Sequence, residues 1–166
     1  MFLITIDGPA GSGKTTLAEM IHENLAKGGE SVATIHMDDL YAGWDLALSP
    51  QLTQTLEQIL KSYFERRQIQ IPQYDWLEER FSSPLTIDSP DVLILEGVGS
   101  GQKITRDSAD IKLWIEAPRE IAFARVLERD GENICPQMQQ WQVRESAHFL
   151  EEGTKSAADY QVKSAP

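Results

Sequence analysis

The sequence predicts an α/β protein of the three-layer α/β/α kind, with helices on both faces of a parallel five-stranded sheet. Short apolar runs alternate along the chain with longer segments of helical periodicity. This alternation is typical of parallel sheets, and strands that are apolar at nearly every position are typical of sheets buried on both faces. The chain of 166 residues has the length of one domain. We therefore predict a single domain over residues 1–166.

Five segments are predicted to be the strands of this sheet. FLITID opens the chain, and DVLILEG is its most hydrophobic run. SVATIHMD and IKLWIEA are apolar at most positions, and DYQV is a short closing strand. In chain order, the predicted strands are 2–7, 31–38, 91–97, 111–117 and 159–162.

Helices are predicted between the strands from apolar side chains that recur every three or four residues. Gly28-Gly29 ends the first helix, and Pro50, Pro118 and Pro136 suit the first turns of three later ones, because a first-turn residue needs no N–H partner. The last of these helices carries Met138, Trp141, Glu145, His148 and Phe149 at helical spacing. Residues 66–90 break the alternation, and the prolines that bound QIQIPQYDW and LTID predict a small hairpin or extended excursion there.

Composition excludes some classes of partner. The formal net charge of -11 repels nucleic acids and anionic membranes, so we expect neither as a partner. The single cysteine, Cys135, excludes an internal disulfide and fits a reducing compartment. The first residues lack the features of a secretory signal, and no apolar run approaches the ~18 residues of a membrane span. We expect a cytoplasmic protein, and the sequence indicates no oligomeric state.

Residues 8–15 match the pattern G-x-x-x-x-G-K-[ST], which is typical of a phosphate-binding P-loop when it lies between a strand and a helix. Glycines let the backbone curl around a phosphate with its N–H groups inward, and the helix N-terminus adds positive charge. Lys14 is expected to reach the β- and γ-phosphates of ATP or GTP, and the Thr15 hydroxyl to ligate Mg²⁺. The predicted nucleotide-binding residues are Gly8, Ala10, Gly11, Ser12, Gly13, Lys14, Thr15 and Thr16.

Acidic residues follow two other strands at the same predicted edge of the sheet. Glu96 closes the run DVLILE, at the edge where open α/β sheets bind ligands, so we expect it to hold Mg²⁺ directly or through water. Asp38 and Asp39 end the predicted strand 31–38. A carboxylate there suits a general base that accepts a proton from an attacking hydroxyl, and Asp38 is also a candidate magnesium ligand.

The motifs that are missing narrow the class of phosphate transfer. No D-x-x-G follows a strand and no N-K-x-D is present, which disfavours GTPase-type switch proteins. A protein kinase places its lysine on a strand rather than in this loop, and an ATP-driven motor usually needs a larger chain. A small-molecule kinase fits best, and a slow ATPase or a nucleotide-binding regulatory module are the alternatives from other classes.

Further motifs resemble those of the uridine kinase-like group of P-loop kinases, which includes uridine–cytidine kinases, phosphoribulokinases and a class of pantothenate kinases. IDGPAGSGKTTLA, HMDDLYAG, IQIPQYDW, VLILEGVGSG, RVLERDG and ADYQV occur in the order and spacing of that group, from about residue 2 to residue 162. The first, second and fourth motifs are also similar to those of cytidylate kinases. The resemblance implies an ATP- and Mg²⁺-dependent kinase that phosphorylates a hydroxyl of a small acceptor, most of all a nucleoside.

The resemblance also implies catalytic roles. Asp38 matches the family's general base, and Glu96 matches the acidic residue at the metal beside Thr15. Arg125 and Arg129 match arginines of a helical lid, here over 119–136, that closes over the phosphates and stabilises the transferring group.

An acceptor-site insertion is implied over about 42–90. Tyr41 matches an aromatic residue close behind the base, and Asp45 matches an aspartate that holds the sugar hydroxyls of the acceptor. Tyr74, Asp75 and Trp76 match the segment that lines the acceptor site, and Trp76 stands where an aromatic ring packs on the nucleobase.

The chain departs from the uridine kinase pattern at the base-reading position. Uridine kinases carry a histidine shortly after the tyrosine–aspartate–aromatic segment, whereas this region here holds Glu78 and Glu79. A carboxylate only accepts hydrogen bonds, so the resemblance does not carry over a base specificity. A cytidylate kinase-like nucleoside monophosphate kinase is therefore an alternative, for which Arg66, Arg67 and Arg80 lie in the right part of the chain.

Overall fold

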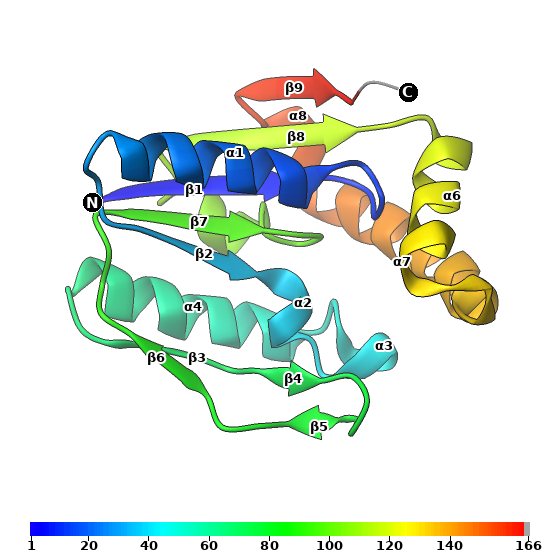
Figure 1. Ribbon diagram of the computed structural model, residues 1–166, viewed down its shortest axis with the longest axis horizontal. Helices are drawn as coiled ribbons and strands as arrows, with labels where there is room; N and C mark the ends of the chain where they lie inside the picture. Colours follow the sequence, from blue (N-terminus) through cyan, green and yellow to red (C-terminus); the bar gives the residue numbers. More distant parts are fainter. Residues whose placement is uncertain (165–166) are drawn as a thin grey trace.

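The computed structural model describes residues 1–164 and has an α/β architecture (Figure 1). Five strands form one sheet in the order β2-β7-β1-β8-β9, and all neighbouring pairs are parallel. These strands are β1 (Phe2–Asp7), β2 (Val32–His36), β7 (Val92–Glu96), β8 (Ile111–Glu116) and β9 (Tyr160–Lys163). The predicted parallel five-stranded sheet is confirmed. Because the strands run the same way, the loops after β1, β2 and β7 meet at one edge.

Helix α1 (Lys14–Lys27) covers one face of the sheet. Alternate residues of a strand point to opposite faces, so Ile4, Ile6 and Ile94 lie together on this side. Ala18 is fully buried against them, because a methyl group lets the helix approach the strands closely. This packing fixes the helix directly behind the loop that joins it to β1.

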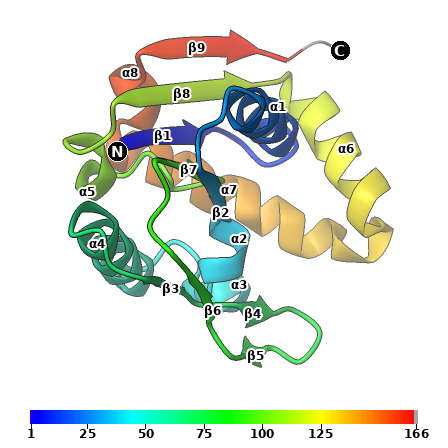
Figure 2. The ribbon, with the colours of Figure 1, turned by 60° about the vertical axis from the view of Figure 1, so that its left-hand side comes forward.

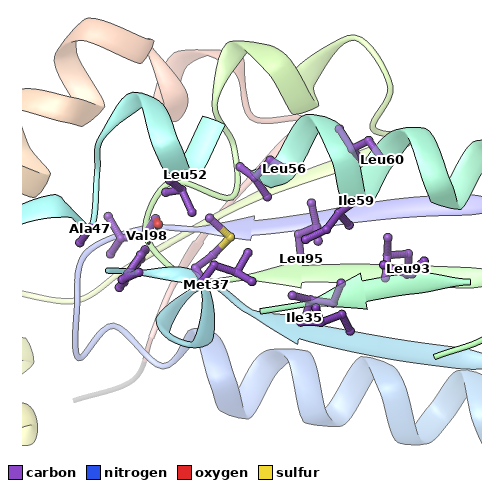
Figure 3. Packing of buried hydrophobic residues seen from close by; sticks show 14 of the residues in the cluster. Ile35, Met37, Ala47, Leu52, Leu56, Ile59, Leu60, Leu93, Leu95 and Val98 are labelled. Carbon is purple, nitrogen blue, oxygen red and sulfur yellow. Dashed lines mark hydrogen bonds between the residues drawn. The ribbon is translucent and has the colours of Figure 1, made fainter. Parts of the chain in front are cut away.

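The other face is covered mainly by α4 (Pro50–Phe64), as Figure 3 shows. Its buried stripe contacts the alternate residues of β2 and β7, including Ile35, Leu93 and Leu95. The stripe consists of Leu52, Leu56, Ile59, Leu60 and Tyr63. Proline at the first turn of α4 and this stripe are as the sequence predicts.

The excursion between α4 and β7 forms two small antiparallel pairs. Strands β3 (Ile69–Ile71) and β6 (Leu85–Ile87) pair beside α4, and β4 (Tyr74–Asp75) pairs with β5 (Arg80–Phe81) beyond them. Figure 2 shows the β4–β5 hairpin extending away from the main sheet. The hairpin expected from the prolines is confirmed, and it reaches toward the edge where the loops meet.

Helices α6 (Arg119–Asp130) and α7 (Cys135–Glu152) lie beside that edge and diverge from the turn that joins them (Figure 2). The short helix η1 (Glu132–Ile134) joins them, and α8 (Thr154–Ala157) links α7 to β9. The predicted lid over 119–136 therefore comprises α6, η1 and the start of α7. Within residues 1–164, no helix is long and apolar enough to cross a membrane.

One strand boundary differs from the sequence-based prediction by more than a single residue. The strand predicted over 31–38 ends at His36, and Met37–Leu40 form the short helix α2. Met37 and Leu40 lie three residues apart and are both buried, so packing favours a helical turn. Gly97 allows this turn, since a Cβ at that position would lie 2.6 Å from the Cβ of Met37. Short helices α3 (Gly43–Leu46) and α5 (Lys103–Arg106) were also not predicted.

Candidate functional site

The loop at residues 8–13 leaves β1 and returns directly into α1. Gly11 has a φ of 76°, a left-handed conformation that side chains disfavour. A Cβ on Gly11 would lie 2.0 Å from the carbonyl oxygen of Ala122 on α6. Glycine is therefore required here both by the backbone conformation and by the close approach of the lid helix.

The residues of this loop fit a phosphate group. The N-terminus of the 14-residue helix α1 lies at its end, where helix N–H groups attract anions. The hydroxyl of Ser12 is fully buried and has no hydrogen-bond partner among the described residues. The ammonium group of Lys14 donates to the carbonyl oxygen of Pro9 at 2.9 Å, which holds its charge over the loop. An oxyanion would supply the missing partner for Ser12 and a charge partner for Lys14.

A hydroxyl and a carboxylate meet beside the loop. The Thr15 hydroxyl donates to Oε1 of Glu96 at 3.3 Å, and Nδ1 of His36 lies 2.7 Å from Oε2 of the same carboxylate. The hydrogen bond to Glu96 raises the pKa of His36 above its usual value. The oxygen atoms of Thr15 and Glu96 are hard ligands that suit Mg²⁺, which usually takes one or two protein ligands together with phosphates and water. No cluster of three His, Cys, Asp or Glu residues forms a self-contained metal site in residues 1–164.

Asp38 lies in the first turn of α2, next to this hydroxyl–carboxylate pair. Asp38 is exposed to solvent on one side. The protein atoms packed around its carboxyl group partly desolvate it, and this desolvation raises its pKa. The Lys14 ammonium opposes that rise, and the neighbouring carboxylate of Glu96 adds to it. Although β2 ends at His36, Asp38 still lies at the expected edge of the sheet.

Aromatic rings line the space beside Asp38. The indole N–H of Trp76 donates to the backbone carbonyl of Asp38 at 3.2 Å. The ring of Trp76 lies edge-to-face against Trp44, with centroids 5.4 Å apart, and against Tyr74, at 5.1 Å. Trp44 in turn contacts Trp141 of α7 at 5.9 Å. The rings come from three separate segments and form a partly exposed apolar wall.

The other predicted acceptor-site residues have different surroundings. Tyr41 is buried, and its hydroxyl donates to the Val98 carbonyl at 2.6 Å, so it supports the wall from beneath. Asp75 accepts the backbone N–H groups of two following residues and thereby shapes the β4–β5 turn. Asp45 is exposed and forms an ion pair with Arg144 of α7 at 2.7 Å.

The two lid arginines both lie on α6. Arg129 binds the carboxylate of Asp130 through two nitrogens, each at 2.7 Å. It is also close enough to Asp38 and Glu96 that their charges raise its pKa. Arg125 donates to the Ser164 hydroxyl at 3.1 Å. Arg129 therefore lies close to the acidic residues of the site.

Sequence reasoning assigned no role to two buried carboxyl groups at the loop. Asp7 ends β1 and accepts the backbone N–H groups of Gly8, Gly99 and Gly101; burial raises its pKa to about 6. Glu145 of α7 accepts the Ala10 N–H at 3.0 Å. An acidic residue inside an apolar helical stripe indicates a buried carboxyl group. Glu145 lies in the predicted stripe of α7, so this signal was present in the sequence.

Taken together, the parallel sheet, the P-loop and the helical lid define the P-loop kinase fold. Solved structures share it. A possible uridine kinase from Bacillus stearothermophilus has a TM-score of 0.70 at 23% identity, covering 97% of this chain and 88% of that one. The shikimate kinase of Bacteroides thetaiotaomicron has a TM-score of 0.56 at 12% identity, covering 96% and 85%. At these identities the likeness concerns the fold alone.

Comparison of sequences identifies the family. A family model described as an AAA domain matches residues 4–143. The uridine kinase of Macrococcus caseolyticus is 30% identical over 144 residues, which are 78% of this chain and 69% of that protein. The cytidylate kinase of Methanococcoides burtonii is 31% identical over 148 residues, which are 89% and 74%. The chain belongs to this AAA-domain family of P-loop proteins and is a relative of uridine and cytidylate kinases.

Proposed function

We propose that the protein is an ATP- and Mg²⁺-dependent kinase that transfers the γ-phosphoryl group to a hydroxyl of a nucleoside. The observation that carries this proposal is the hydrogen bond between the Trp76 indole and the backbone of Asp38. It joins an aromatic wall suited to a planar base to the carboxylate best placed to accept a proton. The uridine kinase relatives support the same acceptor class.

The P-loop residues would hold the nucleotide. The backbone N–H groups of the loop, the α1 N-terminus and the Lys14 ammonium would bind the β- and γ-phosphates. Thr15 and Glu96 would hold Mg²⁺, which neutralises charge on the phosphate oxygens when it is bound. The fit of Ser12 and Lys14 to an oxyanion supports this assignment.

Asp38 would act as the general base. As the acceptor oxygen forms its bond to the γ-phosphorus, its proton passes to the Asp38 carboxylate, and the bond from phosphorus to the ADP oxygen breaks. Arg129, and Arg125 with it, would approach the transferring group when α6 closes. Positioning and charge stabilisation then supply most of the rate enhancement, as in other phosphoryl transfers.

The positions and partners of four arginines favour a nucleoside over a nucleoside monophosphate. Arg66 and Arg67 follow the C-terminal end of α4, where Tyr63 contacts the first residue of β1, at the opposite edge of the sheet from the P-loop. Arg67 is paired with Glu65, and Arg80 lies near Glu78. Arg144 lies in the acceptor region but is bound to Asp45. A cytidylate kinase-like activity is the second candidate, because a relative at 31% identity carries that name.

The test is an ADP-release screen of nucleosides, their monophosphates and a water-only control, with ATP and Mg²⁺ present. We expect release that depends on a nucleoside, is lost in Lys14→Ala, and produces a phosphorylated nucleoside by mass spectrometry. Turnover only with monophosphates would favour the second candidate. Release that no acceptor accelerates would refute the kinase assignment and favour a slow ATPase.

A further inference from the structure

Glu145 is a buried carboxyl group that contacts the phosphate loop from the far end of the chain. It lies on α7, is 4% exposed, and its Oε2 accepts the backbone N–H of Ala10 at 3.0 Å. The loop thus contacts both α6 and α7. Ala122 of α6 approaches Gly11, and Glu145 of α7 binds Ala10. Neither the fold nor the phosphoryl transfer described above requires an acid at this position.

The titratable groups around Glu145 come from three other segments of the chain. Lys14 of α1 favours its ionised form, whereas Asp7 of β1 disfavours it. Tyr41, which follows α2, is near enough that a charge on Glu145 raises the pKa of its hydroxyl. The largest effect is burial, which raises the pKa of Glu145 to about 7, while the Ala10 N–H opposes this rise. Glu145 therefore changes charge within the physiological range.

Phosphate groups in the loop would alter this balance. They bring negative charge to the loop that Glu145 supports, and they compete for the Lys14 ammonium that stabilises the ionised carboxylate. The Ala10 N–H is satisfied by either form, because both the ionised and the neutral carboxyl group accept a hydrogen bond.

We propose that Glu145 is a positioning residue for the nucleotide, which holds the phosphate loop through Ala10 and binds nucleotide phosphates best when it is neutral. Nucleotide binding then includes uptake of a proton by Glu145 above neutral pH. The inference rests on the nucleotide binding that is part of the proposed function, but not on the identity of the acceptor.

The test measures the Kd of Mg-ADP by titration calorimetry between pH 6 and 8.5 for the wild type, Glu145→Gln, Glu145→Ala and Glu151→Gln. Glutamine keeps an acceptor for the Ala10 N–H and does not titrate. Alanine removes the acceptor. Glu151→Gln is the matched control, since it removes the same charge from an exposed position on the same helix. Titrations of ADP and His36 are common to all four proteins and cancel in the comparison.

We expect the affinity of the wild type and of Glu151→Gln to fall with rising pH by about tenfold more than that of Glu145→Gln. Glu145→Ala, checked for folding by circular dichroism, should bind Mg-ADP more weakly than Glu145→Gln at every pH. Calorimetry in buffers of different ionisation enthalpy should show less proton uptake in Glu145→Gln at pH 7.5.

Equal pH dependence in the wild type and Glu145→Gln would overturn the inference. So would equal affinity of the alanine and glutamine variants, because the Ala10 contact would then have no effect on the loop. A wild type that binds Mg-ADP as expected but phosphorylates no nucleoside would refute the proposed function and leave this inference supported. The two failures are therefore distinguishable.

Discussion

Replacing Glu145 by glutamine should stabilise the folded protein at alkaline pH. Burial raises the pKa of this carboxyl group from 4.5 to about 7. A raised acid pKa means that folding favours the protonated form, so the stability present below pH 4.5 is lost as the pH rises through 7. At about 1.4 kcal/mol for each pH unit, the loss approaches roughly 3 kcal/mol. Glutamine has nearly the same shape, keeps the acceptor for Ala10 and carries no charge to desolvate.

The assay is thermal unfolding of the wild type and Glu145→Gln at several values between pH 5 and pH 8.5. For a protein of this size, about 3 kcal/mol corresponds to a rise in Tm of roughly 6–12 °C. We expect that difference at pH 8.5 and a much smaller one at pH 5, where both side chains are neutral. Burial also raises the pKa of Asp7, to about 6, and the charge of Asp7 adds to the penalty on ionised Glu145.

The way the Tm difference varies with pH shows whether glutamine acts through charge or through packing. A difference in Tm that is constant across the range would show that glutamine acts through packing rather than charge. A variant that is less stable than the wild type at pH 8.5 would refute the argument, because it would mean that the ionised carboxylate is stabilised more by Lys14 and Ala10 than burial penalises it. Glu151→Gln, at an exposed position, should show no such dependence.

Three further outcomes are expected. Asp38→Asn should lower kcat by roughly 100- to 10,000-fold, because asparagine cannot accept the proton. The affinity for Mg-ATP, measured by calorimetry, should change little, and full activity of the variant would exclude Asp38 as the base. Trp76→Ala should raise the KM for the nucleoside about tenfold because stacking on the base is lost, and Trp76→Phe should bring the KM most of the way back. Leu77→Ala is the control, since this neighbouring side chain is 95% exposed and its loss should leave the KM unchanged. Gly11→Ala should weaken Mg-ADP binding at least about tenfold and lower the Tm. The new Cβ would lie 2.0 Å from the Ala122 carbonyl oxygen, and the backbone φ of 76° disfavours any side chain. Unchanged binding would mean that α6 moves away at no cost.

The main sheet could be predicted from the sequence because its strands are buried on both faces. FLITID and DVLILEG are apolar throughout, and such runs have few alternatives to a central parallel strand. The strand over 31–38 was predicted to end two residues too late, since Met37 fits a strand pattern as well as a helical turn. The turn is favoured by the burial of Met37 and Leu40 and allowed by Gly97, which is sixty residues away along the chain from Met37.

The P-loop and the acids beside it could be predicted because their chemistry is local. A glycine pattern between a strand and a helix specifies its own backbone, and a carboxylate at the end of a strand lies at a known edge of the sheet. Short helices such as α5 could not be predicted in this way. The hydroxyl of Thr105 in α5 donates to the carbonyls of Ser100 and Gln102, so local turns and their packing, rather than helical periodicity, form it.

What the sequence could not reveal is how α7 joins the two halves of the site. Trp141, Arg144 and Glu145 are spaced three and four residues apart, so they lie on neighbouring positions of one helix surface. Trp141 contacts the aromatic wall through Trp44, and Arg144 forms the ion pair with Asp45. Glu145 binds the phosphate loop, across 135 residues of sequence. Because a single rigid helix makes all three contacts, any displacement of α7 changes the acceptor wall and the phosphate loop together. In the proposed kinase, α7 would therefore be the element through which a movement of α6 reaches both the nucleotide and the acceptor.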